Sequence, residues 1–167
     1  TLSLHDALPI VMTGLLHDTV EEMGVTLETI EKEFGKDVAE LVDGVTKLSK
    51  ITFRTTEEKQ AENFRKMIIA MAKDIRVILV KLADRMNNMR TLKYLAPEKQ
   101  RRSAQETLDI YSPIANRLGI GWMKIELEDL CLRFLHPDVY QKLSDLVQKK
   151  KGERDKFIES FTETLRA

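Results

Sequence analysis

The sequence contains few cysteines, glycines and prolines, carries no net charge and has no long apolar run. A single cysteine, Cys131, rules out an internal disulfide and a cysteine-rich metal site, and it indicates a reducing, cytoplasmic compartment. The balance of 27 Lys and Arg with 27 Asp and Glu excludes DNA binding held mainly by phosphate neutralisation. A hydrophobic content of 43% excludes a disordered chain, and no run approaches the ~18 apolar residues of a membrane span.

Seven glycines and four prolines in 167 residues predict long uninterrupted elements, and the spacing of apolar residues identifies them as helices. The segment 75–82 is rich in β-branched residues, but its helical period continues to Met86, so we expect a helix over 75–92. Pro113 should kink the helix over 97–118, and Gly152 is a possible interruption near the C-terminal end. A polar break at 52–56 separates two further helices, and Thr55 with Glu58 forms a capping box for the second of them. The other helices are expected over 11–22, 26–35, 36–51, 57–73, 122–135, 137–150 and 157–165. The predicted fold class is all-α, a helical bundle cut at both ends.

Residues 1–10 require a separate interpretation. Read back into codons, they resemble a short-read sequencing adapter, so we interpret them as a non-native segment; a natural amphipathic start is the alternative. We therefore expect the natural sequence to begin near Val11 and to lack an upstream portion here. On this interpretation His5 and Asp6 carry no chemistry.

A first candidate site is the pair His17 and Asp18. An imidazole nitrogen beside a carboxylate oxygen suits a divalent metal such as Mn²⁺ or Fe²⁺. Glu21 and Glu22 follow closely, and on a continuous helix Glu21 shares the face of His17 and Asp18. A carboxylate there can deprotonate or orient a water held by the metal. The alternative is a solvated helix end with an acidic tail.

A second candidate is Asp84, which emerges from a strongly apolar helix. A carboxylate on such a surface is costly unless it is paired or binds a metal. Asn88 lies one turn further on and Thr91 two turns further on, so the three form a polar seam. The alternative is an ion pair of Asp84 with Arg85 or Lys81 at the bundle surface.

Several longer motifs resemble a known family. Leu15–Glu22, Asn63–Met67, Ala72–Arg85 and Asn88–Leu92 are similar to the hydrolase domain of RelA/SpoT-family enzymes. Tyr111–Ile120, Glu126–Leu130 and Phe134–Pro137 look like the helical segment that follows it. The resemblance implies an incomplete HD-domain helical bundle over 11–110, a connecting helical segment over 111–150 and the start of a synthetase domain over 151–167.

The resemblance also implies an activity, the Mn²⁺-dependent hydrolysis of the 3′-pyrophosphate of (p)ppGpp to GDP or GTP. His17, Asp18 and Asp84 match three of the family's four metal ligands. Glu21 and Glu22 match the acidic pair that activates water, and Asn88 and Thr91 match residues lining the nucleotide site. The fourth ligand, a histidine, and a basic segment that contacts guanine lie upstream of Val11 in the family. Asn87 and Glu22 depart from the family, which commonly has histidine and aspartate there.

Three functions therefore compete. The first is a fragment, inactive by itself, of a cytoplasmic (p)ppGpp hydrolase that is also a GTP pyrophosphokinase; contact with the ribosome would run through regions outside this sequence. The second is an HD phosphohydrolase acting on another nucleotide. The third is a catalytically silent helical module that relays signals between domains or to a ribosome-bound partner. The intact His17, Asp18 and Asp84 favour the first.

Overall fold

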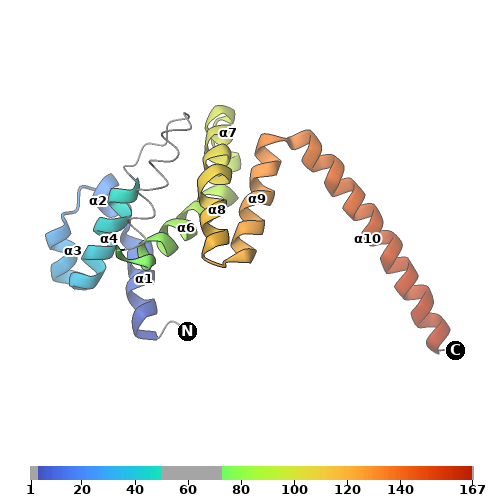
Figure 1. Ribbon diagram of the computed structural model, residues 1–167, viewed down its shortest axis with the longest axis horizontal. Coiled ribbons are helices and arrows are strands. Elements are labelled where there is room, and N and C mark those ends of the chain that lie inside the picture. The colour runs from blue at the N-terminus through green and yellow to red at the C-terminus, as the bar shows by residue number, and fades with distance from the viewer. Residues whose placement is uncertain (1–3, 50–72, 167) are drawn as a thin grey trace.

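The computed structural model describes residues 4–49 and 73–166, and all regular structure within these ranges is helical (Figure 1). The predicted all-α class is confirmed. None of the described helices is long and apolar enough to cross a membrane. The predicted helix over 57–73, its capping box and the Asn63–Met67 motif lie outside the described residues. The elements are α1 (Leu4–Leu16), α2 (Thr19–Glu22), α3 (Leu27–Phe34), α4 (Lys36–Ser49), α6 (Ile75–Arg90), η1 (Leu92–Tyr94), α7 (Pro97–Glu106), η2 (Thr107–Tyr111), α8 (Ser112–Arg117), α9 (Gly121–Leu135) and α10 (Pro137–Arg166).

The N-terminal helix differs from the prediction. Instead of one helix over 11–22, α1 ends at Leu16 and α2 begins at Thr19. The Thr19 hydroxyl donates a 2.6 Å hydrogen bond to the Leu16 carbonyl, a local side-chain bond that competes with helix continuation. The expectation of a continuous helix is therefore wrong, and His17 and Asp18 lie in the turn between two helices.

The ambiguous apolar segment is helical, as predicted. Asp74 caps α6 by accepting a 2.8 Å hydrogen bond from the backbone N–H of Arg76. The Arg76 guanidinium also donates to both oxygens of Asp37 on α4, at 2.8 and 2.7 Å. This bidentate pair ties the beginning of α6 to the beginning of α4, and the hydrogen bonds from Asp37 and Asp74 raise the pKa of Arg76 above its ordinary value.

The helix predicted over 97–118 is interrupted in the expected region. The turn of η2 is wider than an α-helical turn, and the Ser112 N–H bonds five residues back, to the Thr107 carbonyl. Pro113 follows in the first turn of α8, where its missing N–H is tolerated. By contrast, Gly152 does not break the C-terminal helix: α10 is continuous over Pro137–Arg166. One glycine in a helix costs only about 1 kcal/mol relative to alanine, too little to end the helix.

Helix α6 is the centre of the bundle and contacts α1, α4 and α9. A larger core cluster surrounds it, and a smaller one joins α3 to α4 with residues of α1 packed against it. The larger cluster includes Leu41, Val45, Ile78, Leu82, Met89, Ile114 and Leu127; the smaller consists of Ile30, Val38, Ala39 and Val42. The close approach of α4 to α6 requires Gly44, because a Cβ there would lie 2.7 Å from Cγ2 of Val77.

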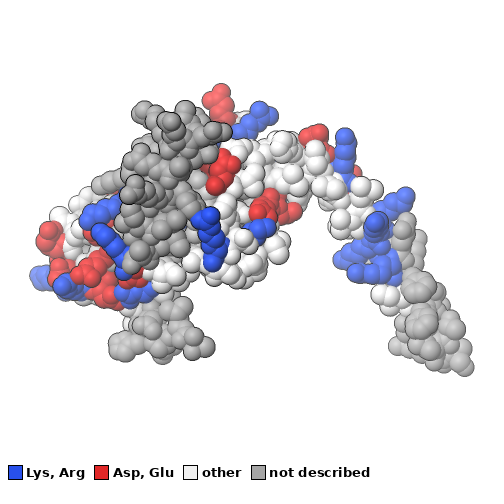
Figure 2. Space-filling model, viewed as in Figure 1, with Lys and Arg blue, Asp and Glu red and all other residues white. Residues whose placement is uncertain are grey.

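Helix α10 extends away from the bundle and packs on α9 at its beginning (Figure 1). Charges of both signs are interspersed over α3 and α4 in Figure 2, whereas basic side chains gather on α10 around Lys149–Lys151.

Candidate functional site

The packing of α1 against α6 brings together the two sites predicted separately. Nε2 of His17 lies 3.1 Å from Oδ1 of Asp18 and 3.6 Å from Oδ1 of Asp84. The side chains of His17 and Asp84 are only 15% and 13% exposed, whereas that of Asp18 is 55% exposed. A half-solvated aspartate and a nearly buried one therefore face the same imidazole nitrogen.

The hydrogen bond of the other ring nitrogen sets the tautomer of His17. Nδ1 lies 2.8 Å from the Gly14 carbonyl oxygen, which can only accept, so Nδ1 carries the proton. In the neutral imidazole Nε2 then presents a lone pair, and this atom is buried without a hydrogen-bond partner. Histidine ligands of metals commonly donate their second ring N–H to a backbone carbonyl in this way.

The carboxylate of Asp84 is held at both oxygens by residues of its own helix. Nζ of Lys81 donates to Oδ2 at 2.8 Å, and Nδ2 of Asn88 donates to Oδ1 at 2.8 Å. The ion pair with Lys81, the alternative from the sequence, is thus present together with the contact to His17. Arg85 does not pair with Asp84; its Nη2 donates to Glu106 at 2.9 Å.

The donor set fits a divalent cation. A buried imidazole nitrogen that has no hydrogen-bond partner and lies near two carboxylate oxygens has the ligand chemistry of Mn²⁺ or Fe²⁺ sites. Within residues 4–49 and 73–166, no three His, Cys, Asp or Glu side chains close around one point. His17 instead forms two separate pairs, one with Asp18 and one with Asp84, and the second pair includes the Lys81 ammonium.

Glu21 and Glu22 lie on α2, immediately after the turn that holds His17 and Asp18. Both are exposed. The backbone N–H of Glu22 donates a 2.8 Å hydrogen bond to the Asp18 carbonyl. In the described part of the chain, no hydrogen bond or ion pair joins the carboxylate of Glu21 or Glu22 to the side chain of His17, Asp18 or Asp84. The predicted face shared by Glu21 with His17 and Asp18 required a continuous helix, which the structure does not have. Their role in activating water stays a prediction.

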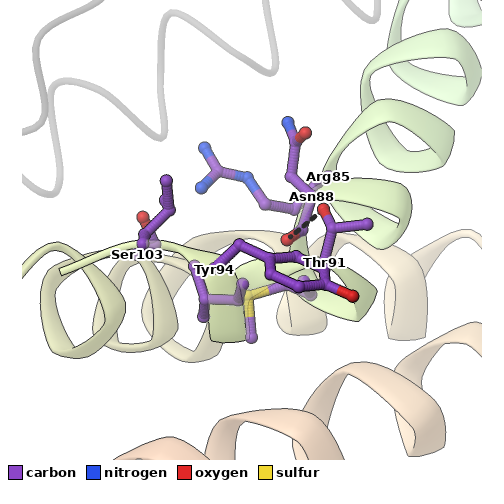
Figure 3. A pocket seen from close by; sticks show the side chains of 8 residues that line it. Arg85, Asn88, Thr91, Tyr94 and Ser103 are labelled. Carbon is purple, nitrogen blue, oxygen red and sulfur yellow. Dashed lines mark hydrogen bonds between the residues drawn. The ribbon is translucent and has the colours of Figure 1, made fainter. Parts of the chain in front are cut away.

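A cavity of about 320 Å³ lies beside the carboxyl-terminal half of α6 and contains both predicted substrate residues, Asn88 and Thr91. Figure 3 shows Arg85 and Asn88 on one side of it and the Tyr94 ring on another. The Thr91 hydroxyl bonds back to the carbonyls of Asn87 and Asn88 at 3.0 and 3.3 Å. The lining residues are Arg85, Asn88, Met89, Thr91, Leu92, Tyr94, Leu95 and Ser103. Asn88 therefore links this cavity to Asp84.

Arg85 is a residue of this cavity that the sequence interpretation missed, since it considered Arg85 only as a partner of Asp84. Its guanidinium stacks over the Tyr111 ring, 4.2 Å from the centroid, and donates to the Tyr111 hydroxyl at 3.1 Å. Burial by itself would lower the pKa of Arg85, but Tyr111 and Glu106 outweigh it and raise that pKa. The spacing between Arg85 and its partners is non-local, so no local pattern could have revealed the contact.

A second cavity, of about 400 Å³, lies between α1 and α6. His17 and Asp84 both line it, together with Asn87 and an apolar wall. The remaining lining residues are Ile10, Val11, Gly14, Leu79, Val80 and Ala83. The His17–Asp84 pair is therefore accessible from this side, and through Asn88 it adjoins the other cavity.

Comparison with known proteins identifies one domain family and several similar proteins. A protein-family model described as "HD domain" matches residues 2–121. A "GTP pyrophosphokinase" of Myxococcus xanthus is 59% identical over 94% of this chain and 21% of its own length. A "Probable guanosine-3′,5′-bis(diphosphate) 3′-pyrophosphohydrolase" of Synechocystis is 57% identical over 93% of the chain and 20% of its length. The "Bifunctional (p)ppGpp synthase/hydrolase SpoT" of Escherichia coli is 54% identical over 90% of the chain and 22% of its own length. The chain thus spans about a fifth of the curated relatives it matches.

Proposed function

This chain belongs to the HD domain family, and from that premise we propose that it forms most of a site that hydrolyses the 3′-pyrophosphate of (p)ppGpp to GDP or GTP. The resemblance to RelA/SpoT enzymes predicted from the motifs is confirmed by relatives that are 50–59% identical to it. An HD phosphohydrolase domain implies a divalent metal, for which we propose Mn²⁺. The relatives' names extend the proposal to a parent protein that is also a GTP pyrophosphokinase.

One observation carries the proposal: Nε2 of His17 is buried, has no hydrogen-bond partner and faces carboxylate oxygens of Asp18 and Asp84. These three residues would hold the metal. A bound divalent ion polarises a phosphoryl oxygen and acidifies water near neutral pH. The chain's own contribution is preorganisation, because the Gly14 carbonyl fixes the His17 tautomer.

The cavity beside Asn88 and Thr91 suits a nucleotide. Met89, Leu92 and Leu95 provide apolar surface for a base or ribose, and the Tyr94 ring offers a stacking face. Polar groups of Asn88 and Thr91 can orient the ligand. Since Asn88 also donates to Asp84, a nucleotide in this cavity would lie next to the metal-binding residues.

Glu21 and Glu22 are proposed to position and deprotonate the attacking water. Their support is the resemblance and their place directly after the His17–Asp18 turn. Both carboxylates are exposed, so they are free to take up a proton and pass it to solvent.

We expect the 167-residue chain alone to be inactive. The family resemblance assigns a fourth ligand, a histidine, and a guanine-contacting segment to sequence before Val11. With three of four ligands, both metal and substrate binding should be weak.

The test is pyrophosphate release from ppGpp by a full-length protein that carries the natural sequence upstream of Val11. Release should require Mn²⁺ and should disappear in His17→Ala, with Lys47→Met, an exposed change on α4, as the matched control. A folded, metal-loaded protein that leaves ppGpp intact would instead indicate another nucleotide substrate. Absence of both release and bound metal would indicate a silent regulatory module.

A further inference from the structure

Lys81 is unusually enclosed for a lysine. Its side chain is only 11% exposed, and its Nζ lies 2.8 Å from Oδ2 of Asp84. Lysine is almost never buried to this degree unless it is paired. The comparable helical pair of Lys47 with Asp43 is, in contrast, 73% and 32% exposed. Water and salt therefore screen the Lys81–Asp84 pair much less than an ordinary surface ion pair.

Lys81 also provides a positive charge beside the carboxylates of this cluster. Two carboxylates, those of Asp18 and Asp84, face Nε2 of His17 at 3.1 and 3.6 Å. Arg85, the next cation along α6, is engaged with Glu106 and Tyr111. The Lys81 ammonium thus neutralises the more deeply buried carboxylate of the proposed metal site.

We propose that Lys81 is a built-in substitute for the metal ion: it neutralises Asp84 in the metal-free protein and is displaced from that carboxylate when a divalent cation binds. The inference rests on the proposed function, because it concerns the same metal site. A divalent ion and an ammonium on one poorly solvated carboxylate repel each other strongly. Lys81 therefore stabilises the metal-free fold and at the same time weakens metal binding.

The arrangement of the donors agrees with this competition. While Lys81 is bound to Oδ2 of Asp84, no three acidic or imidazole side chains of the described segments enclose an ion. Asn88 holds the other oxygen, Oδ1, on the side of His17. Release of Lys81 frees Oδ2 and leaves Asp84 oriented by Asn88 alone.

Two simpler roles for Lys81 predict different results. If the pair only stabilised α6, removing the ammonium would lower thermal stability and leave metal affinity unchanged. If Lys81 only positioned Asp84 as a ligand, removing it would weaken metal binding. Competition alone predicts that removing the charge lowers the stability of the metal-free protein and tightens its binding of metal.

The experiment compares Lys81→Met with the unaltered full-length protein after removal of metal by a chelator. Calorimetric titration with Mn²⁺ should show a Kd at least tenfold lower in Lys81→Met. Thermal unfolding should show a lower Tm without metal and a larger rise in Tm on adding Mn²⁺. Lys81→Arg keeps the charge, so its Kd for Mn²⁺ should stay within a fewfold of the original value. The exposed control Lys47→Met should leave the Kd for Mn²⁺ unchanged.

Lys81→Gln covers the case in which Lys81→Met does not fold, because its amide can still donate to Asp84 while the charge is gone. It should also tighten Mn²⁺ binding. An equal or higher Kd in either folded neutral variant would overturn the proposal while leaving the metal site intact, provided that His17→Ala abolishes binding in the same titration. Absence of Mn²⁺ binding in the original protein and in both neutral variants would overturn this inference and the proposed metal site together.

Discussion

Replacing Gly44 with alanine tests the close packing of α4 on α6, the helix that carries Asp84. The added Cβ would lie 2.7 Å from Cγ2 of Val77, whereas carbon atoms in contact prefer about 3.5–4.0 Å. Val77 is buried and β-branched, so its side chain has little freedom to rotate away. The two helices must therefore separate by a large part of an ångström, or Val77 must leave its preferred rotamer.

Two effects of opposite sign compete in Gly44→Ala. Overpacking a core costs about 1–3 kcal/mol. Alanine gains about 1 kcal/mol over glycine within a helix. We expect overpacking to win, with a net loss of about 1 kcal/mol and a fall in Tm of about 2–4 °C for a protein of this size.

The assay is urea unfolding followed by circular dichroism, with two companion variants. Gly14→Ala adds its methyl group where no atom lies within 4 Å, so it should stabilise α1 by about 0.5–1 kcal/mol. Combining Gly44→Ala with Val77→Ala should cost less than the sum of the two single changes, because each relieves the clash of the other. A Gly44→Ala protein more stable than the original would refute the close packing of α4 and α6.

Three further predictions concern the surroundings of the site. Tyr111→Phe removes the hydroxyl that accepts a hydrogen bond from the Arg85 guanidinium. It should lower the free energy of unfolding in urea by about 1–2 kcal/mol, and an unchanged urea midpoint would contradict this. The hydrogen bond from Arg76 holds the pKa of Asp74 below its ordinary value, so its contribution is complete above that ordinary value and is lost as the pH falls through the lower, folded-state pKa. Asp74→Asn should therefore flatten the acid side of a plot of unfolding midpoint against pH; an unaltered slope would contradict this. Burial raises the pKa of Cys131 to about 12, and its Sγ donates to the Ala104 carbonyl. Iodoacetamide should label this thiol only after unfolding, and rapid labelling of the native protein would disprove its enclosure.

Local patterns predicted most of the helices correctly because helix formation depends on near neighbours. The apolar period through Met86 identified α6 despite its β-branched residues, and the helix expected over 26–35 is present as α3, with Thr26 as its N-cap. The errors arose where a single interaction decided the outcome. The Thr19 hydroxyl ends α1 before His17, and the cost of Gly152 is too small to divide α10.

The site was predicted unevenly for a related reason. The spacing of Lys81, Asp84 and Asn88 along one helix face is readable from the sequence, and Lys81 and Asn88 each donate a hydrogen bond to Asp84. The resemblance to RelA/SpoT enzymes named His17, Asp18 and Asp84 as a ligand set, but composition and spacing alone could not join the two segments. Arg85 was missed because its partners, Glu106 and Tyr111, belong to later elements.

The sequence by itself determined the all-helical class, the polar seam of α6 and, through its motifs, the family. Only the tertiary structure decided that His17 faces Asp84, that Nε2 of His17 has no hydrogen-bond partner, and that Lys81 neutralises the buried carboxylate. The physical reason is the distance along the chain over which the deciding interactions act. Helix periods and caps depend on residues within about a turn, whereas burial and the meeting of α1 with α6 depend on how the whole apolar core packs.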